Sequence, residues 1–360
     1  MAKKLNMKKD DYQFLKELVE APSPSGFEEP AAQVFRKRLE RSADLVETNV
    51  IGSVHATLKG SVAGAPSVML AGHIDEVGLM VNYISPEGYL TAAMIGGVDA
   101  AILPGLRVNV HTADGPLLGV MGRQPIHLID RKERESVTKL EKLFIDLGLP
   151  GDEVKKKVRV GDPITIHVGM EKFGDDLVVS RALDDKMGAW ICARVLEEVK
   201  KAGGSAGDVI AAATVQEEIG ARGGATSAYS VNPDIFIAIE VGHATDYPDI
   251  DKRHHGDMVV GGGPSFGRGP NINKEVLRRL EKAAKKVKEE YQINAEPDAT
   301  GTDANPAQVS RAGHAAALVS IPNRYMHTPT EVISLRDLEA AVKILTRFVL
   351  DLDADIKLIP

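Results

Sequence analysis

Three short apolar runs in this chain each end in acidic or imidazole side chains. The runs and the residues that follow them are 67–72 with His73, 208–215 with Glu217 and Glu218, and 235–239 with Glu240. Continuous apolar runs of this length are typical of strands buried on both faces. Open α/β sheets bind their ligands beyond the carboxyl ends of the strands. The pattern therefore predicts an α/β fold with a site at one edge of a central sheet.

Helical spacing of apolar residues predicts the elements that cover this sheet. Residues 10–42 indicate two helices joined by a Pro/Ser/Gly turn at 22–26, and Ser25 and Glu28 have capping-box spacing for the second. A helix is expected over 186–199, with Asp185 as its N-cap. Two later amphipathic helices are predicted by the following apolar stripes: Val276, Leu280, Ala283, Ala284 and Val287, then Leu338, Val342, Leu345 and Val349 behind Ser334 and Asp337 as caps.

The pattern of apolar and polar residues changes between residues 77 and 170. Short alternating segments such as 107–111 and 164–168 are separated by Gly, Pro and Asp turns, which predicts a small antiparallel β module. A charged stretch around 131–147 is expected to be helical. An insertion here would separate His73 from Asp184 in the sequence but not in space.

Composition narrows the class of protein. The chain has 360 residues, 43% hydrophobic and 26% charged, which suits one large or two ordinary domains of an α/β enzyme. A net charge of −7 gives no electrostatic reason to bind nucleic acid or acidic membranes. The single Cys192 excludes an intramolecular disulfide and is expected to be a buried, inert thiol. No run of about eighteen apolar residues and no signal peptide is visible, so a cytoplasmic location is expected.

Metal-binding side chains occur in five separate stretches. They are Ala71-Gly72-His73-Ile74-Asp75-Glu76, Ala182-Leu183-Asp184-Asp185-Lys186, Gln216-Glu217-Glu218-Ile219-Gly220, Ile239-Glu240-Val241 and Met326-His327-Thr328-Pro329. Two imidazoles with several carboxylates and no thiolate is the donor set of a co-catalytic zinc, cobalt or manganese pair. Such a pair supports hydrolysis, because two cations can activate a shared water and polarise a carbonyl.

These stretches identify a family resemblance. In this order, and together with Ala21-Pro22-Ser23-Pro24-Ser25-Gly26 and Gly301-Thr302-Asp303, they resemble the TET aminopeptidases, the glutamyl (deblocking) aminopeptidase family of tetrahedral co-catalytic-zinc metallopeptidases. The resemblance runs nearly end to end. It implies a zinc-exopeptidase-like catalytic domain, a mixed sheet with helices on both faces, formed by residues 1–76 and 171–360. It also implies an inserted β-rich dimerisation domain at 77–170, and dimers that build a twelve-subunit shell.

The resemblance also assigns metal ligands. It implies two divalent metals per subunit, with zinc preferred over cobalt or manganese, and a cis peptide bond between Asp184 and Asp185. Asp184 would bridge both metals. The remaining ligands would be His73 and Glu240 at one metal, and Glu218 and His327 at the other. Glu240 stands where the family often has aspartate, which leaves the metal preference of that site open.

Two further acidic residues are expected to support catalysis. Asp75 lies two residues after His73, on the same side of an extended chain, and would accept the second ring N–H of that histidine; a plain loop acid is the alternative. The side chains of Glu217 and Glu218 diverge in extended geometry, so one can bind metal while the other faces water. The resemblance makes Glu217 the general base. Asp303 would hold the substrate amine, orient His327, or simply be a turn residue.

The predicted function is a metal-dependent aminopeptidase that removes N-terminal residues from peptides with a metal-activated water. Glu217 would take the proton of that water and return it to the leaving amine. About five negative groups against about four positive charges from two metals would suit a free α-ammonium. Peptides and other copies of the chain are the expected partners. Two alternatives are a glycoside hydrolase of the endoglucanase kind and a catalytically silent assembly protein. Adjacent Glu217 and Glu218 cannot span a glycosidic bond about 5–9 Å across.

The other histidines are not assigned to metal. His254 and His255 have no partner at ligand spacing, and His314 is expected to be structural. His243, three residues after Glu240, could line the pocket.

Overall fold

A computed structural model describes residues 7–131, 134 and 136–359. Its centre is a mixed eight-stranded sheet in the order β1-β2-β12-β3-β13-β16-β14-β15. The four middle strands β12, β3, β13 and β16 run parallel, and antiparallel β2 and β14 flank them. The strands of this sheet are β1 (Leu45–Thr48), β2 (Val54–Leu58), β3 (Val68–His73), β12 (Val209–Thr214), β13 (Ile235–His243), β14 (Ser265–Arg268), β15 (Gln292–Ala295) and β16 (Ala315–Asn323).

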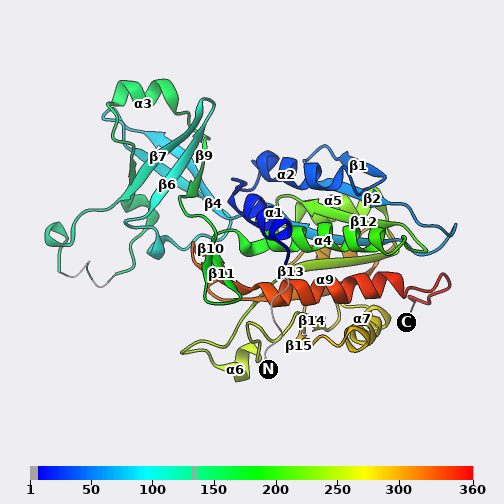
Figure 1. Ribbon diagram of the computed structural model, residues 1–360. Helices are drawn as coiled ribbons and strands as arrows, with labels where there is room; N and C mark the ends of the chain where they lie inside the picture. The colour runs from blue at the N-terminus through cyan, green and yellow to red at the C-terminus, as the bar shows by residue number, and fades with distance from the viewer. Residues whose placement is uncertain (1–6, 132–133, 135, 360) are drawn as a thin grey trace.

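Helices cover both faces of the sheet (Figure 1). The long helix α4 packs across β3, β12 and β13, with α1 and α9 beside it, whereas α5 and α8 pack together against β12, β13 and β16. The helices are α1 (Lys9–Glu20), α2 (Glu29–Leu39), α3 (Gly151–Lys157), α4 (Leu183–Lys201), α5 (Arg222–Val231), α6 (Lys252–His255), α7 (Lys274–Val287), α8 (Ala304–Gln308) and α9 (Leu335–Leu350). The predicted α/β class and the mixed sheet with helices on both faces are confirmed.

A small closed barrel is inserted between β3 and α4, and it projects from one end of the molecule in Figure 1. Its strands, in barrel order, are β4 (Gly78–Ile84), β5 (Leu90–Ile95), β8 (Phe144–Asp146), β7 (Gly115–Gly122), β6 (Arg107–Thr112) and β9 (Pro163–Ile166). Short 3-10 helices lie between them at Ala100–Ile102, Ile126–Leu128 and Leu140–Lys142. Alternating residues such as Val108 and Val110 point inward and form a hydrophobic core separate from that of the main sheet.

A third, three-stranded sheet lies where the chain leaves the barrel. Its strands are β10 (Glu171–Phe173), β11 (Leu177–Ser180) and β17 (Glu331–Ser334), all antiparallel. Strand β11 leads directly into Asp184 at the start of α4, and β17 follows His327. The small sheet therefore brings these two residues, far apart in the sequence, to the same end of the central sheet.

The expected helix around 131–147 is wrong for the residues that the structure describes; residues 132, 133 and 135 lie outside them. Only the single 3-10 turn Leu140–Lys142 is helical there, apart from Arg134, and β8 follows. Ile145 is fully buried and pairs with Leu90 and Met121. The barrel needs this strand to close, and closure outweighs the local helical preference of a charged sequence.

Three predicted helix caps are also wrong. Helix α2 begins after Glu28, whose side chain makes no cap, and the Ser25 hydroxyl donates instead to Asp75. The carboxylate of Asp185 accepts from the amide of His73 rather than from α4. The carboxylate of Asp337 accepts from the amides of Gly261 and Gly263. Ser334 does cap α9, through the amide of Arg336. In the first three cases, a buried tertiary partner replaces the local one.

Cys192 is buried and free, as expected. Among the described residues, none of the helices has the length and apolar content needed to cross a membrane. The cytoplasmic location stays a prediction.

Candidate metal centre

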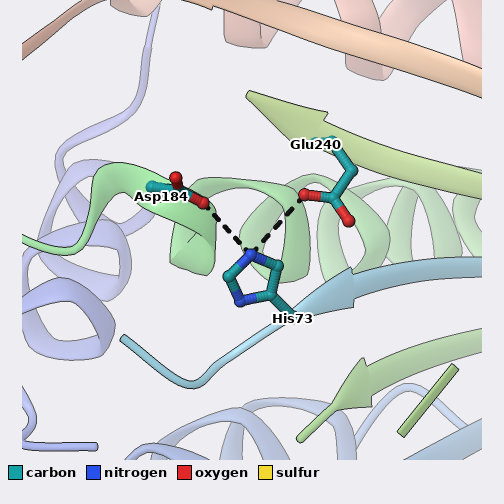
Figure 2. A group of neighbouring side chains, drawn as sticks. All are labelled: His73, Asp184 and Glu240. Atoms are coloured by element: carbon teal, nitrogen blue, oxygen red, sulfur yellow. Dashed lines mark hydrogen bonds and ion pairs between the residues drawn. The ribbon is translucent and has the colours of Figure 1, made fainter. Parts of the chain in front are cut away.

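One group of potential ligands gathers around the ring of His73 (Figure 2). His73 is the last residue of β3, Glu240 lies within β13, and Asp184 lies at the start of α4. His73 Nε2 is 3.1 Å from Asp184 Oδ1 and 3.5 Å from Glu240 Oε2. Two carboxylates from different elements thus converge on one ring nitrogen, which is the arrangement expected around a shared cation.

A second group lies on the other side of Asp184 and contains Glu218 and His327. His327 Nε2 is 3.3 Å from Asp184 Oδ2 and 3.3 Å from Glu218 Oε2. Each oxygen of Asp184 therefore faces a different histidine. This places Asp184 between the two groups, as a bridging ligand would be.

The backbone at Asp184 is unusual. Asp184 and Asp185 have non-helical dihedral angles within the first turn of α4, and the peptide bond between them is cis. The cis bond agrees with what the resemblance implies.

Glu217 borders both groups without belonging to either. Its Oε2 lies 3.9 Å from His73 Nε2, and its side chain is 13% exposed, so it is partly buried beside the cluster and still open to water. Burial, with the charges of Asp303 and Glu218 nearby, raises the pKa of the Glu217 carboxyl to about 8, against the opposing effect of His73.

Asp75 does more than its predicted task. His73 Nδ1 is 3.1 Å from the backbone carbonyl oxygen of Asp75 and 3.3 Å from its carboxylate, so the main chain shares the role expected of the side chain. The carboxylate also accepts from the backbone amides of Glu217 at 3.0 Å and Glu218 at 3.1 Å, and from the Ser25 hydroxyl at 2.7 Å. Asp75 therefore connects His73 with the two glutamates.

Glu331 is a supporting residue that the sequence analysis missed. It is buried at the start of β17, where Oε1 accepts from the amide of His327 at 2.9 Å and Oε2 from the amide of Asp184 at 3.1 Å. Burial, together with the charge of Asp184, raises its pKa well above the usual value. The only feature of the sequence that points to Glu331 is its position four residues after His327. That feature alone does not predict a supporting role.

The barrel also reaches the second group. His327 Nδ1 lies 3.0 Å from the carbonyl oxygen of Gly97, in the loop after β5. A Cβ at Gly97 would lie 3.0 Å from the same nitrogen, so glycine permits this close approach. The bond leaves His327 Nε2 free to face Asp184 and Glu218. An adjacent glycine pair, Gly96 and Gly97, is the signal that could have suggested it.

The electrostatics of the cluster suit a cation. Burial and neighbouring carboxylates raise the pKa of Glu240 well above its usual value, and burial raises that of Glu218. Burial alone would lower the pKa of His73, but Glu240, Asp184 and Asp75 raise it instead. Hydrogen bonds to Asp184 and Glu218 raise the pKa of His327 to about 11. The carboxylates of the cluster thus lie close enough together to favour the binding of protons or of another cation.

Two oxygens make the fit to metal more specific. Among the described residues, Oε1 of Glu218 and Oε1 of Glu240 are buried without a hydrogen-bond partner. A buried carboxylate oxygen normally has a partner, because leaving one unpaired costs about 1–3 kcal/mol or more. One imidazole and two carboxylates at each group is a donor set that zinc, cobalt or manganese accepts. The residues therefore fit two divalent cations that share Asp184.

Asp303 lies close to this cluster, within electrostatic reach of Glu217 and Glu240. Its Oδ2 accepts from the Thr214 hydroxyl at 2.6 Å, and its Oδ1 is buried without a partner among the described residues. Burial raises its pKa to about 6. His243, which could have lined the pocket, is exposed at the end of β13. His254 and His255, for which no metal role was predicted, are exposed in α6.

The family model of M42 glutamyl aminopeptidases matches residues 52–344 of the chain. The lysyl aminopeptidase of Pyrococcus furiosus is 32% identical over 340 residues, which are 93% of this chain and 95% of that protein.

Solved structures agree with this match. A TET aminopeptidase from Thaumarchaeota archaeon SCGC AB-539-E09 superposes with a TM-score of 0.90 at 32% identity, covering 96% of this chain and 97% of that one. The TET1 peptidase of Pyrococcus horikoshii, which can assemble into a tetrahedron or a large octahedral shell, gives 0.83 at 27% identity, covering 95% and 100%.

Proposed function

Because the chain belongs to the M42 glutamyl aminopeptidase family, and is thus a metal-dependent aminopeptidase, we propose that the cluster around Asp184 is its catalytic centre. The observation that carries this proposal is the position of Asp184, with one carboxylate oxygen toward each of two histidines. The predicted TET-type family and aminopeptidase activity are confirmed.

We propose that His73, Asp184 and Glu240 hold one divalent ion, and that Asp184, Glu218 and His327 hold the other. Zinc is the ion we expect first, with cobalt or manganese as substitutes. Two cations bound there would lower the pKa of a water and polarise the carbonyl oxygen of the scissile peptide bond.

Glu217 is the residue that moves the proton in this proposal. Its Oε2 lies 3.9 Å from His73 Nε2, and its side chain is partly exposed to water. The carboxylate would take a proton from the attacking water and return it to the nitrogen of the leaving peptide. Asp75 supports the step, because its carboxylate holds the amides of Glu217 and Glu218 and, with its own main-chain carbonyl, orients His73.

The charge of the site supports recognition of a free α-ammonium. Five carboxylates lie in or beside it, namely those of Asp75, Asp184, Glu217, Glu218 and Glu240. The carboxylate of Asp303 is a sixth nearby. Two divalent ions supply only four positive charges. A positively charged amino terminus of the substrate would offset the remaining negative charge.

Acetylating the amino terminus of a peptide should therefore slow its cleavage. Losing a hydrogen-bonded charge costs about 1.5–3 kcal/mol, so kcat/KM should fall by about 10- to 100-fold. The measurement is chromatography of timed digests of a free peptide and its acetylated twin. The free peptide should shorten one residue at a time from its amino end. Equal rates on both peptides would point to a deacylase or endopeptidase and refute this proposal.

We also propose that the barrel, within the inserted segment 77–170, forms a dimer contact and that dimers build a larger shell. Support comes from large apolar side chains exposed on the barrel, namely Tyr83, Met94, Leu118, Val120, Ile126 and Leu128. Exposed apolar side chains on a small domain mark an interaction surface where they form one patch. The remaining segments, 1–76 and 171–360, would form the catalytic domain.

Light scattering tests this assembly. The particle mass should be many times 38.6 kDa, the mass of one chain. Replacing Leu118 and Val120 together with glutamate should reduce it, because the pair is about half exposed on β7 and charge there opposes burial. Exchanging Val50, which is fully exposed outside the barrel, is the control. A monomer at micromolar concentration with metal present would contradict the proposal.

A further inference from the structure

The segment that carries Glu217 is held by carboxylates from elsewhere in the chain. Three consecutive backbone amides, those of residues 216–218, each donate to a carboxylate oxygen. The amides of Glu217 and Glu218 donate to Asp75, and the amide of Gln216 donates to Glu28 Oε1 at 3.1 Å. The last contact spans 188 positions of sequence.

The side chain of Glu28 is buried and held in position for this contact. It lies in the loop between α1 and α2, is only 6% exposed, and also accepts from the amide of Gly26 at 2.7 Å with the same oxygen. Gly26 has a φ of +90°, so the loop adopts a turn that glycine favours and that brings its amide back to Glu28. The hydrogen bond from Gly26, in the same loop, thus fixes the position of the Glu28 carboxyl group that accepts from Gln216.

Gln216 needs such an anchor. It follows β12 with a φ of +56°, in the left-handed region that residues other than glycine seldom adopt. This turn decides the direction in which the next residue, Glu217, projects. Asp75 holds the amides of both Glu217 and Glu218, and Glu28 adds a further anchor one residue before the base.

We propose that Glu28 is a positioning residue that sets the orientation of Glu217 through the amide of Gln216. The inference rests on the proposed function, in which Glu217 is the general base. A reacting group displaced by about 1 Å can lose about 100-fold in rate. Loss of the Glu28 contact should therefore lower kcat, whereas the two metal groups, which do not include Gln216, should stay intact.

Glu28 acts through the length of its side chain rather than through its charge. Oε1 accepts both amide hydrogens, and an amide oxygen in the same place can also accept two hydrogen bonds. Glu28→Gln keeps the length and the acceptor but removes the ionisable group. Glu28→Asp keeps the ionisable group but is one methylene shorter and should not reach Gln216.

The experiment compares these two variants with the native enzyme on an aminoacyl reporter, with metal content measured in parallel. Glu28→Asp should lose about 10- to 100-fold in kcat, with KM within about threefold and the native metal content. Glu28→Gln should keep kcat within about threefold of native. Glu29→Asp is the matched control and should behave as native. Glu29 is adjacent but exposed, and its side chain accepts from Gln33 within the same helix.

Hydrogen exchange of the peptide spanning residues 214–220 gives a readout that does not depend on activity. Exchange should be faster in Glu28→Asp than in Glu28→Gln or the native chain, because only the first loses the bond to the Gln216 amide. If the native enzyme cleaved no peptide, the proposed function would fail, while the exchange result would still decide whether Glu28 anchors the segment.

The inference is overturned if Glu28→Asp keeps native kcat, or if Glu28→Gln loses as much as Glu28→Asp, which would make the charge the important property. Loss of metal or a rise in KM alone in Glu28→Asp would also overturn it. Should Glu28→Asp fail to fold, a loss of kcat or faster exchange in Glu28→Gln would still overturn the inference.

Discussion

Replacing Glu217 with glutamine should lower kcat by about two to four orders of magnitude while the metal content stays at its native value. A positioned general base contributes about that much to a rate, and glutamine cannot accept the proton of the attacking water. The metals should stay because Glu217 belongs to neither ligand group. The amide of residue 217 would still donate to Asp75, so the segment should keep its shape.

Turnover and elemental analysis of the same preparation check this prediction. Glu218→Gln is the matched comparison, since it changes the adjacent residue in the same way but removes an anionic ligand of one metal. It should lose or weaken one metal, and excess metal should restore some activity. Should Glu217→Gln lose a metal while Glu218→Gln keeps both, the two roles are reversed.

Replacing Asp184 with asparagine should have an even broader effect. Its two oxygens lie 3.1 Å from His73 Nε2 and 3.3 Å from His327 Nε2, so both groups lose a charged donor at once. Loss of metal function removes several kcal/mol of transition-state stabilisation, which corresponds to about 1,000-fold or more in kcat/KM. Metal content per chain should fall below that of Glu218→Gln, because that variant affects one group only.

Elemental analysis after dialysis, with circular dichroism to show that the chain is folded, measures this difference. A folded Asp184→Asn variant that keeps two metals and native turnover would show that Asp184 does not bridge them.

The ends of the parallel strands were predictable from the sequence. His73 and Glu240 stand at the carboxyl ends of apolar runs, and β3 and β13 are neighbouring parallel strands. Parallel strands carry such residues to the same edge of the sheet. The barrel was predictable for a similar reason, because alternation around Val108 and Val110 marks strands with one buried face.

The partners that support the site could not be predicted from the sequence. Glu28 and Glu331 each accept from one amide that is distant in the sequence, that of Gln216 and that of Asp184 respectively. Nothing in their local pattern separates them from ordinary helix caps or surface acids. Ser25 and Glu28 have the spacing of a capping box, yet their side chains turn to Asp75 and to Gln216. Tertiary hydrogen bonds in a buried site outweigh the small energy of a local cap.

The central claim, that two divalent metals held by this cluster drive aminopeptidase action, is tested most directly by returning metal to protein treated with a chelator. Activity on an aminoacyl reporter is followed as zinc, cobalt or manganese is added in known amounts. The account predicts almost no activity before addition, and a rise that levels off at two metal ions per chain. Full activity in the chelator-treated protein, or a rise that levels off at one ion per chain, would contradict it.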